Sequence, residues 1–316
     1  MKYRTLGKTG IQVSPLCLGT MQFGWTADET TSFEILSAAY DAGINFFDTA
    51  DMYSNWVDGN PGGISEEIIG RWWKQAQIPR EKLVIATKVR GPMGEPPTEG
   101  LSHKRIIQMV EGSLRRLQLE YIDLYLAHWP DEEIEIEETL RAFDDLVQSG
   151  KVRSIGCSNY GSAALLAALK TSDQFDLANF ETIQPKYNLV HRTEFESELQ
   201  VICKDHNIGV IPYSPLAEGF LTGKYRRDFT PESERAERIS SNFTDKNWNL
   251  LDEMAVIASA HEATVTQVAL AWLLANPTIT SPIIGANSKA QLKDSLAAVE
   301  LTLKNEEIKL LSRLSA

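Results

Sequence analysis

Strand-like and helix-like segments alternate along most of this chain, and the alternation limits the folds that are open to it. The strand-like segments are short, apolar and rich in β-branched residues, and they begin near Val13, Asn45, Leu83, Ile122, Arg153, Thr182, Gly209 and Ser281. The segments between them repeat apolar residues at the spacing of a helix face. Eight strands with helices between them predict an α/β fold, the closed (β/α)8 TIM barrel.

Two helix-like segments have ends that can be recognised. Residues 33–43 and 139–150 each place apolar residues on one face and end in a glycine, Gly43 and Gly150. Glycine suits the position after a helix because it adopts the left-handed conformation without strain. Ser65, which two glutamates follow, predicts an N-cap with acidic residues in the first turn.

An open doubly wound sheet is the alternative architecture. It normally carries a glycine-rich phosphate turn after its first strand, and residues 16–24 do not match GxGxxG. We therefore expect a single barrel domain over residues 1–316. Residues 1–13, with the turn Gly7-Lys8-Thr9-Gly10, predict a short N-terminal β-hairpin that closes the barrel floor.

Composition and charge exclude several classes of protein. A hydrophobic content of 43% is enough for a large core, which excludes disorder as the main state. The formal net charge of −12 argues against nucleic acid or an anionic membrane as a partner. The start of the sequence lacks an apolar signal segment, and no apolar run is long enough to span a membrane, so we expect a cytoplasmic protein without a membrane partner. The oligomeric state cannot be read from the sequence.

Three cysteines, Cys17, Cys157 and Cys203, are widely spaced and odd in number. This pattern indicates reduced thiols in a cytosolic protein and not a disulfide framework or a zinc site. We expect no metal.

Titratable residues stand at the carboxyl ends of three successive strand-like segments. Asp48, Lys88 and His128 each end or follow such a segment, and Tyr53 lies on the loop after Asp48. A titratable side chain at the end of a buried strand needs a partner or must face a cleft. The carboxyl ends of barrel strands form one face, so we expect these four side chains to converge there.

The four residue types suit proton transfer to a carbonyl oxygen. An isolated tyrosine has a pKa of about 10, and a nearby lysine cation should lower that of Tyr53. Asp48 would hold Lys88 charged and fixed, and a neutral His128 would orient the substrate oxygen. Each residue alone has a structural explanation, but the matched positions at successive strand ends favour a shared catalytic role.

The chain resembles the aldo-keto reductases over nearly its whole length. The motif at residues 43–50, Gly-Ile-Asn-Phe-Phe-Asp-Thr-Ala, with Tyr53 after it, is similar to the family's first signature. Residues 63–70, Thr87-Lys88 and His128-Trp129-Pro130-Asp131 extend the likeness. The resemblance implies reduction of an aldehyde or ketone to an alcohol, with the partner a small carbonyl substrate and Tyr53 as proton donor. A dehydrogenase oxidising an alcohol or sugar alcohol, or a cofactor-sensing regulatory subunit, is the alternative.

The resemblance also implies a nicotinamide cofactor site. Ser158, Asn159 and Gln184 match residues that bind the carboxamide, Tyr213 matches the residue that stacks on the ring, and the run after it matches the segment that wraps the pyrophosphate. The expected cofactor-binding residues are Ser158, Asn159, Gln184, Tyr213, Ser214, Pro215, Leu216, Gly219, Leu221, Thr222, Gly223, Lys224, Gly285, Asn287, Gln291 and Ser295.

The choice between NADP and NAD depends on a few positions. Many relatives have a basic residue for the 2′-phosphate of NADP where this chain has Asn287, and an asparagine for the adenine where it has Ser295. Lys289 is a candidate to replace that basic residue in part, and the direction of its side chain cannot be read from the sequence. NADP is expected from the family pattern, and NAD or dual use stays open.

Substrate specificity is expected in three tryptophans and two loops. Trp25, Trp56 and Trp129 fall near strand ends and are candidates for the wall of a pocket for an apolar or sugar-like carbonyl. Residues 92–100 form a Pro/Gly-rich loop beyond Lys88. Residues 214–248 are polar, and their length predicts a lid or cofactor belt, with a solvated surface insertion as the alternative. That stretch contains the arginines Arg226, Arg227, Arg235 and Arg238.

Overall fold

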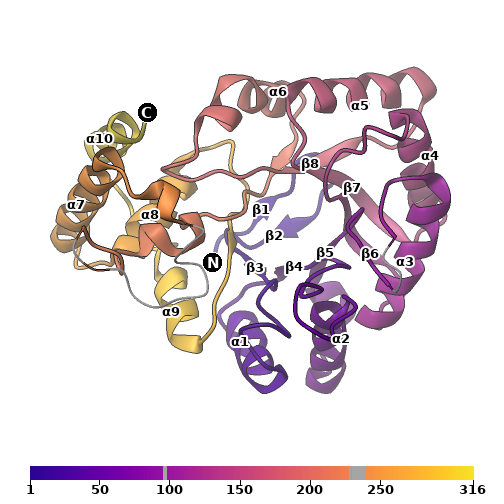
Figure 1. Cartoon of the computed structure of the whole chain (residues 1–316), viewed down its shortest axis with the longest axis horizontal. Helices are drawn as coiled ribbons and strands as arrows, with labels where there is room; N and C mark the ends of the chain where they lie inside the picture. The colour runs from indigo at the N-terminus through magenta and orange to yellow at the C-terminus, as the bar shows by residue number, and fades with distance from the viewer. Residues whose placement is uncertain (95–97, 228, 230–238) are drawn as a thin grey trace.

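Residues 1–94, 98–227, 229 and 239–316 are described by a computed structural model. They form the expected (β/α)8 barrel with a short N-terminal β-hairpin (Figure 1). The barrel strands are parallel and run in the order β10-β3-β4-β5-β6-β7-β8-β9. Their bounds are β3 Cys17–Gly19, β4 Phe46–Asp48, β5 Val84–Val89, β6 Ile122–Ala127, β7 Val152–Ser158, β8 Phe180–Gln184, β9 Gly209–Val210 and β10 Ile283–Ile284.

The ring of strands closes between β9 and the segment that leads into β10. Val210 pairs in parallel with Ile279, and its carbonyl accepts hydrogen bonds from the N–H groups of Thr280 and Ser281. The first and last strands, β3 and β10, are neighbours, with Cys17 opposite Ile283. Residues far apart in the sequence therefore meet at one seam of the barrel.

Helices surround the strands (Figure 1). Those of eight residues or more are α1 Glu29–Asp41, α2 Ile64–Ala76, α3 His103–Leu117, α4 Ile136–Gln148, α5 Ser162–Phe175, α7 Asp245–Ala260, α8 Val265–Ala275, α9 Lys289–Ala297 and α10 Asn305–Ser315. A shorter helix, α6 Gln200–Asp205, precedes β9. Helices α7 and α10 pack against each other at one side of the barrel.

Alternation along each strand divides the core into two parts. In β5, Val84 and Ala86 point into the barrel interior, whereas Ile85 and Val89 belong to the large cluster between the sheet and the helices. Parallel strands that are buried on both faces read as continuous apolar runs, which makes them recognisable in the sequence. Lys88 has the inward parity of Val84 and Ala86, and it lies at the mouth.

The N-terminal hairpin lies at the floor. Its strands β1 Arg4–Thr5 and β2 Gln12–Val13 pair antiparallel, and Leu6 belongs to the barrel's inner apolar cluster. At Gly7 a Cβ would stand 2.5 Å from the carbonyl oxygen of Glu181 in β8 and 2.7 Å from the nitrogen of Gly209 in β9. Only glycine allows this approach to the amino ends of the strands.

Two expected element ends are wrong and two are confirmed. Val13 belongs to the hairpin, and the first barrel strand starts at Cys17, after a short turn through Pro15. Ser65 is not an N-cap, because Gly63 caps α2 in the left-handed conformation, with φ +90°. Gly43 and Gly150 follow α1 and α4 with φ +93° and +73°, as expected.

Candidate functional site

The four catalytic candidates converge at the mouth of the barrel. Asp48 ends β4, Lys88 lies near the end of β5, and His128 directly follows β6. Lys88 Nζ donates hydrogen bonds to Asp48 Oδ2 at 2.7 Å, to the Thr49 carbonyl oxygen at 2.8 Å and to Tyr53 Oη at 2.9 Å. A fully buried ammonium group has three protons, and here each has an acceptor.

Neighbouring residues hold the strand that carries Lys88. Thr87 points to the opposite side of β5, where its Oγ1 donates to Glu66 of α2 at 2.6 Å. Glu66 also accepts from Arg116 Nε of α3 at 2.6 Å. Both Thr87 and Glu66 are fully buried, so β5 is fixed against the helix layer. Lys88 projects into the mouth from a rigid support.

Burial controls the protonation of the candidate proton donor. It raises the pKa of Tyr53 to about 12, although the charge of Lys88 acts in the opposite direction. Lys88 thus lowers this pKa as expected, but burial, which depends on tertiary packing, outweighs the lysine and makes the net shift upward. Burial alone would lower the pKa of Lys88, but Asp48 and Tyr53 together outweigh it and raise that pKa. At neutral pH both Lys88 and Tyr53 carry their protons.

The surroundings of His128 favour its neutral form. Burial is the main cause that lowers its pKa well below the ordinary value, and the charges of Lys88 and Arg90 add to the effect. Its ring centroid lies 6.0 Å from that of Tyr53 and is stacked on Trp129 at 3.8 Å. Its Nδ1 is buried and has no hydrogen-bond partner among the described residues.

The residues expected to bind the carboxamide are linked to one another. Ser158 Oγ donates to the Gln184 carbonyl oxygen at 2.9 Å, and Asn159 Nδ2 donates to the His128 carbonyl oxygen at 2.9 Å. Tyr213 Oη donates to Asn159 Oδ1 at 2.8 Å. The ring of Tyr213 is half-buried and fixed by this bond. Amide and hydroxyl groups beside a fixed flat ring fit a carboxamide-bearing aromatic ring.

The segment after Tyr213 is an irregular turn close to the mouth. The carbonyl of Ser214 accepts a hydrogen bond from Asn188 Nδ2 at 2.8 Å. The 3-10 helix η3, Ala217–Thr222, contains Glu218 and Gly219 with positive φ. Successive turns of this kind present backbone N–H groups, which suit an anion. The segment after Tyr213 also contains the remaining predicted cofactor-binding residues of this run, which are Pro215, Leu216, Leu221, Thr222, Gly223 and Lys224.

The predicted residues after β10 form a second group. Gly285 lies beside Gln22, whose amide donates to the Ala286 carbonyl oxygen at 2.9 Å. Asn287 Oδ1 accepts from Thr26 Oγ1 at 2.9 Å, while its backbone N–H donates to Gln291 Oε1 at 2.8 Å. Ser295 is buried within α9.

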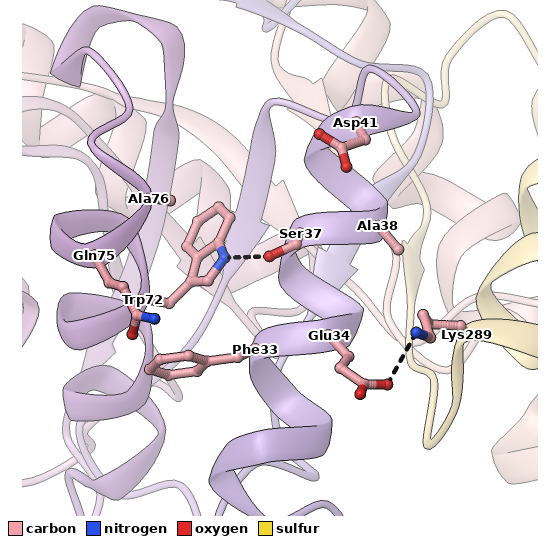
Figure 2. A pocket seen from close by; sticks show the side chains of 9 residues that line it. All are labelled: Phe33, Glu34, Ser37, Ala38, Asp41, Trp72, Gln75, Ala76 and Lys289. Atoms are coloured by element: carbon pink, nitrogen blue, oxygen red, sulfur yellow. Dashed lines mark hydrogen bonds and ion pairs between the residues drawn. The ribbon is translucent and has the colours of Figure 1, made fainter.

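Lys289 points toward α1. Its Nζ lies 3.1 Å from Glu34 Oε2, and both side chains are more than half exposed. Figure 2 shows this ion pair at the edge of a groove between α1 and α2, on the outside of the barrel. Lys289 is therefore already paired with a carboxylate.

The three tryptophans lie around the candidate catalytic tyrosine. Trp25 and Trp56 meet edge to face with ring centroids 5.6 Å apart, and Trp56 contacts Tyr53 in the same way at 6.4 Å. Trp56 is 43% exposed, which is high for so large an apolar side chain. Trp129 covers one face of His128. The structure thus brings all three to one region.

The long segment 214–248 is described only in part. Arg227 pairs with Asp245 at 2.6 Å and donates to Asn249, while Arg226 lies over the ring of Phe229. Arg235 and Arg238 lie outside the described residues, and so does the middle of the loop 92–100.

Sequence reasoning missed two residues. Asn188 donates a hydrogen bond to the backbone carbonyl of Ser214. Asp51, which lies in the sequence between Asp48 and Tyr53, is fully buried. A second carboxylate so close to Asp48 was visible in the sequence, but its burial was not. Across the described ranges there is no cluster of three potential metal ligands, and no helix is long and apolar enough to cross a membrane.

Comparison with known proteins adds an independent finding. The model of the Aldo/keto reductase family matches residues 15–316. A Bacillus subtilis protein named "Uncharacterized oxidoreductase YrpG" is 41% identical over 99% of this chain and 95% of its own length. A "Probable voltage-gated potassium channel subunit beta" of Arabidopsis thaliana is 34% identical, over 95% of this chain and 92% of its own length. A "Putative voltage-gated potassium channel subunit beta" of Schizosaccharomyces pombe is 36% identical, over 94% of this chain and 88% of its own length.

Proposed function

Because the chain belongs to the aldo/keto reductase family, we propose that it reduces an aldehyde or ketone to an alcohol with Tyr53 as the proton donor. The chain is an NAD(P)H-dependent oxidoreductase. The observation that carries the proposal is the hydrogen-bonded series Tyr53–Lys88–Asp48 at the mouth of the barrel.

The geometry supports a proton relay built from these side chains. When bound, a reduced nicotinamide supplies a hydride to the carbonyl carbon. Tyr53 must be protonated before it can donate, and its raised pKa keeps it so at neutral pH. Lys88 stabilises the phenolate that the donation leaves behind, and Asp48 holds Lys88 in place. His128, whose lowered pKa favours the neutral ring, donates a hydrogen bond from its ring N–H to the carbonyl oxygen of the substrate without competing as an acid.

Replacement of Tyr53 by phenylalanine tests the proton-donor assignment. We expect Tyr53→Phe to lower kcat by about 10²- to 10⁴-fold, because the reaction loses its general acid. Affinity for NADPH, measured by fluorescence titration, should stay within about twofold of the original. Tyr3→Phe is the matched control, since that side chain is exposed and its hydroxyl donates to the Gly43 carbonyl oxygen, away from the mouth. Near-normal turnover by Tyr53→Phe would remove this residue from the mechanism.

NADPH is the proposed cofactor, and Asn287 and Lys289 are the reasons to measure NADH beside it. Lys289 is engaged with Glu34, which weakens its attraction for a 2′-phosphate. Glu34→Gln should therefore raise the affinity for NADPH relative to NADH by about two- to fivefold, the range of an exposed ion pair. Glu29→Gln on the same helix serves as the control, because Glu29 pairs with Arg71. An equal gain for both cofactors would show that Lys289 does not face the phosphate.

A second candidate function is that of a cofactor-sensing regulatory subunit. It is favoured by the names of two relatives, which are called potassium channel β subunits. Slow turnover with every carbonyl tested, together with a stable complex with a channel protein, would support this candidate over the enzyme. Faster oxidation of an alcohol with NADP⁺ or NAD⁺ than reduction of its carbonyl would instead indicate a dehydrogenase.

A further inference from the structure

Gln184 makes a contact across the mouth of the barrel. It is the last residue of β8, and Asp48 is the last residue of β4, with β5, β6 and β7 between them in the sheet. Gln184 Nε2 nevertheless donates a hydrogen bond to Asp48 Oδ1 at 2.8 Å. Both side chains are 2% exposed.

This contact completes the coordination of Asp48. Its Oδ2 accepts from Lys88 at 2.7 Å, and its Oδ1 accepts from Gln184. A carboxylate held at one oxygen can still turn about its bond to Cβ, whereas a carboxylate held at both oxygens has a fixed plane. Since Lys88 also holds Tyr53, rotation of Asp48 would displace Lys88 from the tyrosine. Gln184 therefore supports the relay through Asp48.

The chemistry also fixes which way the Gln184 amide faces. The Asp48 carboxylate only accepts hydrogen bonds, so the NH₂ group of Gln184 must point toward it. This orientation leaves Gln184 Oε1 as an acceptor. A primary carboxamide offers the complementary N–H donor.

Backbone contacts connect Gln184 to the rest of the site. Its carbonyl oxygen accepts from Ser158 Oγ at 2.9 Å and from the Asn159 N–H at 3.4 Å. Asn159 in turn bonds to the His128 carbonyl oxygen and to Tyr213. One hydrogen-bonded network thus runs from Tyr213 through Gln184 to Asp48.

We propose that Gln184 is a positioning residue of the proton relay, and that a carboxamide bound at its Oε1 locks the amide that holds Asp48. The inference rests on the proposed reductase function. In this arrangement, the alignment of Asp48, Lys88 and Tyr53 depends on whether the carboxamide-bearing ring is bound. Tyr53 is then aligned by Lys88 when the hydride donor is bound.

Two substitutions test this role. Gln184→Met keeps the length of the side chain but removes both the Nε2 donor and the Oε1 acceptor. We expect it to lower kcat by about 100-fold, whereas the Kd for NADPH should rise by less than about fivefold, the value of one neutral hydrogen bond. Gln184→Glu places a second carboxylate beside Asp48. It should be nearly inactive at about pH 8 and recover in part below about pH 6, where a protonated carboxyl again donates to Asp48.

The control lies two residues earlier on the same strand. Thr182 is fully buried, its Oγ1 has no hydrogen-bond partner within the described residues, and Thr182→Val should leave kcat and its pH profile unchanged. A loss of NADPH affinity that matches the loss of kcat in Gln184→Met, together with no recovery of Gln184→Glu below about pH 6, would overturn the positioning role. A wild-type protein that binds NADPH but reduces no carbonyl would contradict the proposed function instead.

Crystal structures of the wild-type protein and of Gln184→Met test the positioning role of Gln184 even if the protein reduces no carbonyl. In Gln184→Met, the distance from Lys88 Nζ to Tyr53 Oη should lengthen beyond the hydrogen-bond range of about 3.2 Å. An unchanged distance and an unrotated Asp48 carboxylate would refute the inference independently of turnover.

Discussion

Asp51 and Asp123 are both fully buried, yet their surroundings differ. Asp123 bonds to Arg80, to Arg153 and to the N–H of Ile85. No side chain in the part of the chain that the structure describes donates a hydrogen bond to Asp51, and the backbone N–H of Met52 lowers its pKa less than burial raises it. A buried charge without a partner is expensive, so the two aspartates should respond in opposite ways to the loss of charge.

Burial, reinforced by nearby Glu66, raises the pKa of Asp51 to about 8, while Arg116 and Arg105 oppose the shift. The unfolded chain releases this proton near pH 4, so Asp51 lowers the free energy of unfolding progressively from about pH 4 to pH 8. The change in the free energy of unfolding caused by Asp51→Asn should therefore be more favourable at pH 8 than at pH 5, by more than about 1 kcal/mol. Urea denaturation at the two pH values measures the difference.

Asp123→Asn is the counterpart. It leaves two guanidinium groups without their carboxylate and should cost about 2–4 kcal/mol. If both variants lost stability equally at pH 8, the carboxyl group of Asp51 would have to be ionised and satisfied in the folded protein.

Helix ends show how far local rules reach. Gly150 follows α4 with φ +73°, and a Cβ at this position would meet no atom of the described residues within 4 Å, so only the backbone conformation opposes a side chain. Gly150→Ala should cost about 1 kcal/mol. Gly161, the N-cap of α5, is equally open but has φ −77°. Gly161→Ser should be neutral or slightly stabilising. Thermal unfolding of both variants checks the contrast, and equal losses would contradict it.

Elements whose signals are local were predictable, and those that depend on distant contacts were not. A few neighbouring residues are enough to predict the apolar strands β5 and β6 and the glycines that follow α1 and α4. Ser65 followed an N-cap pattern, but its hydroxyl instead bonds to Thr20 and Thr49 from neighbouring strand ends. The competing partners come from other parts of the chain, which a local pattern cannot show.

The same division applies to the site. The convergence of Asp48, Lys88 and His128 follows from the geometry of barrel strands, which place their carboxyl ends on one face. The net pKa of Tyr53 and the bond between Gln184 and Asp48 required the packed molecule. Likewise, the direction of Lys289 depends on α1, which lies far from it in the sequence.

The floor of the barrel offers a test of the whole assembly. Gly7 and Gly10 both have positive φ, +53° and +72°, but a Cβ at Gly7 would collide with backbone atoms of β8 and β9, whereas Gly10 is open toward the described residues. Gly10→Ala should cost about 1 kcal/mol. Gly7→Ala should cost at least about 3 kcal/mol, since the hairpin must move away from the floor. Equal costs in chemical denaturation would show that the hairpin adds little to barrel stability.

The seam between β3 and β10 has a consequence for how the protein is made. During synthesis, one edge of β3 can pair with β4 early, because β4 follows it closely in the sequence. The other edge of β3 stays unpaired until β10, near the end of the chain, has been made. At a translation rate of about 5–20 residues per second, the interval between the synthesis of β4 and that of β10 is on the order of tens of seconds. An unpaired strand edge is a site for wrong pairing. A nascent chain on the ribosome is therefore most vulnerable to aggregation between the emergence of its first and its last barrel strand.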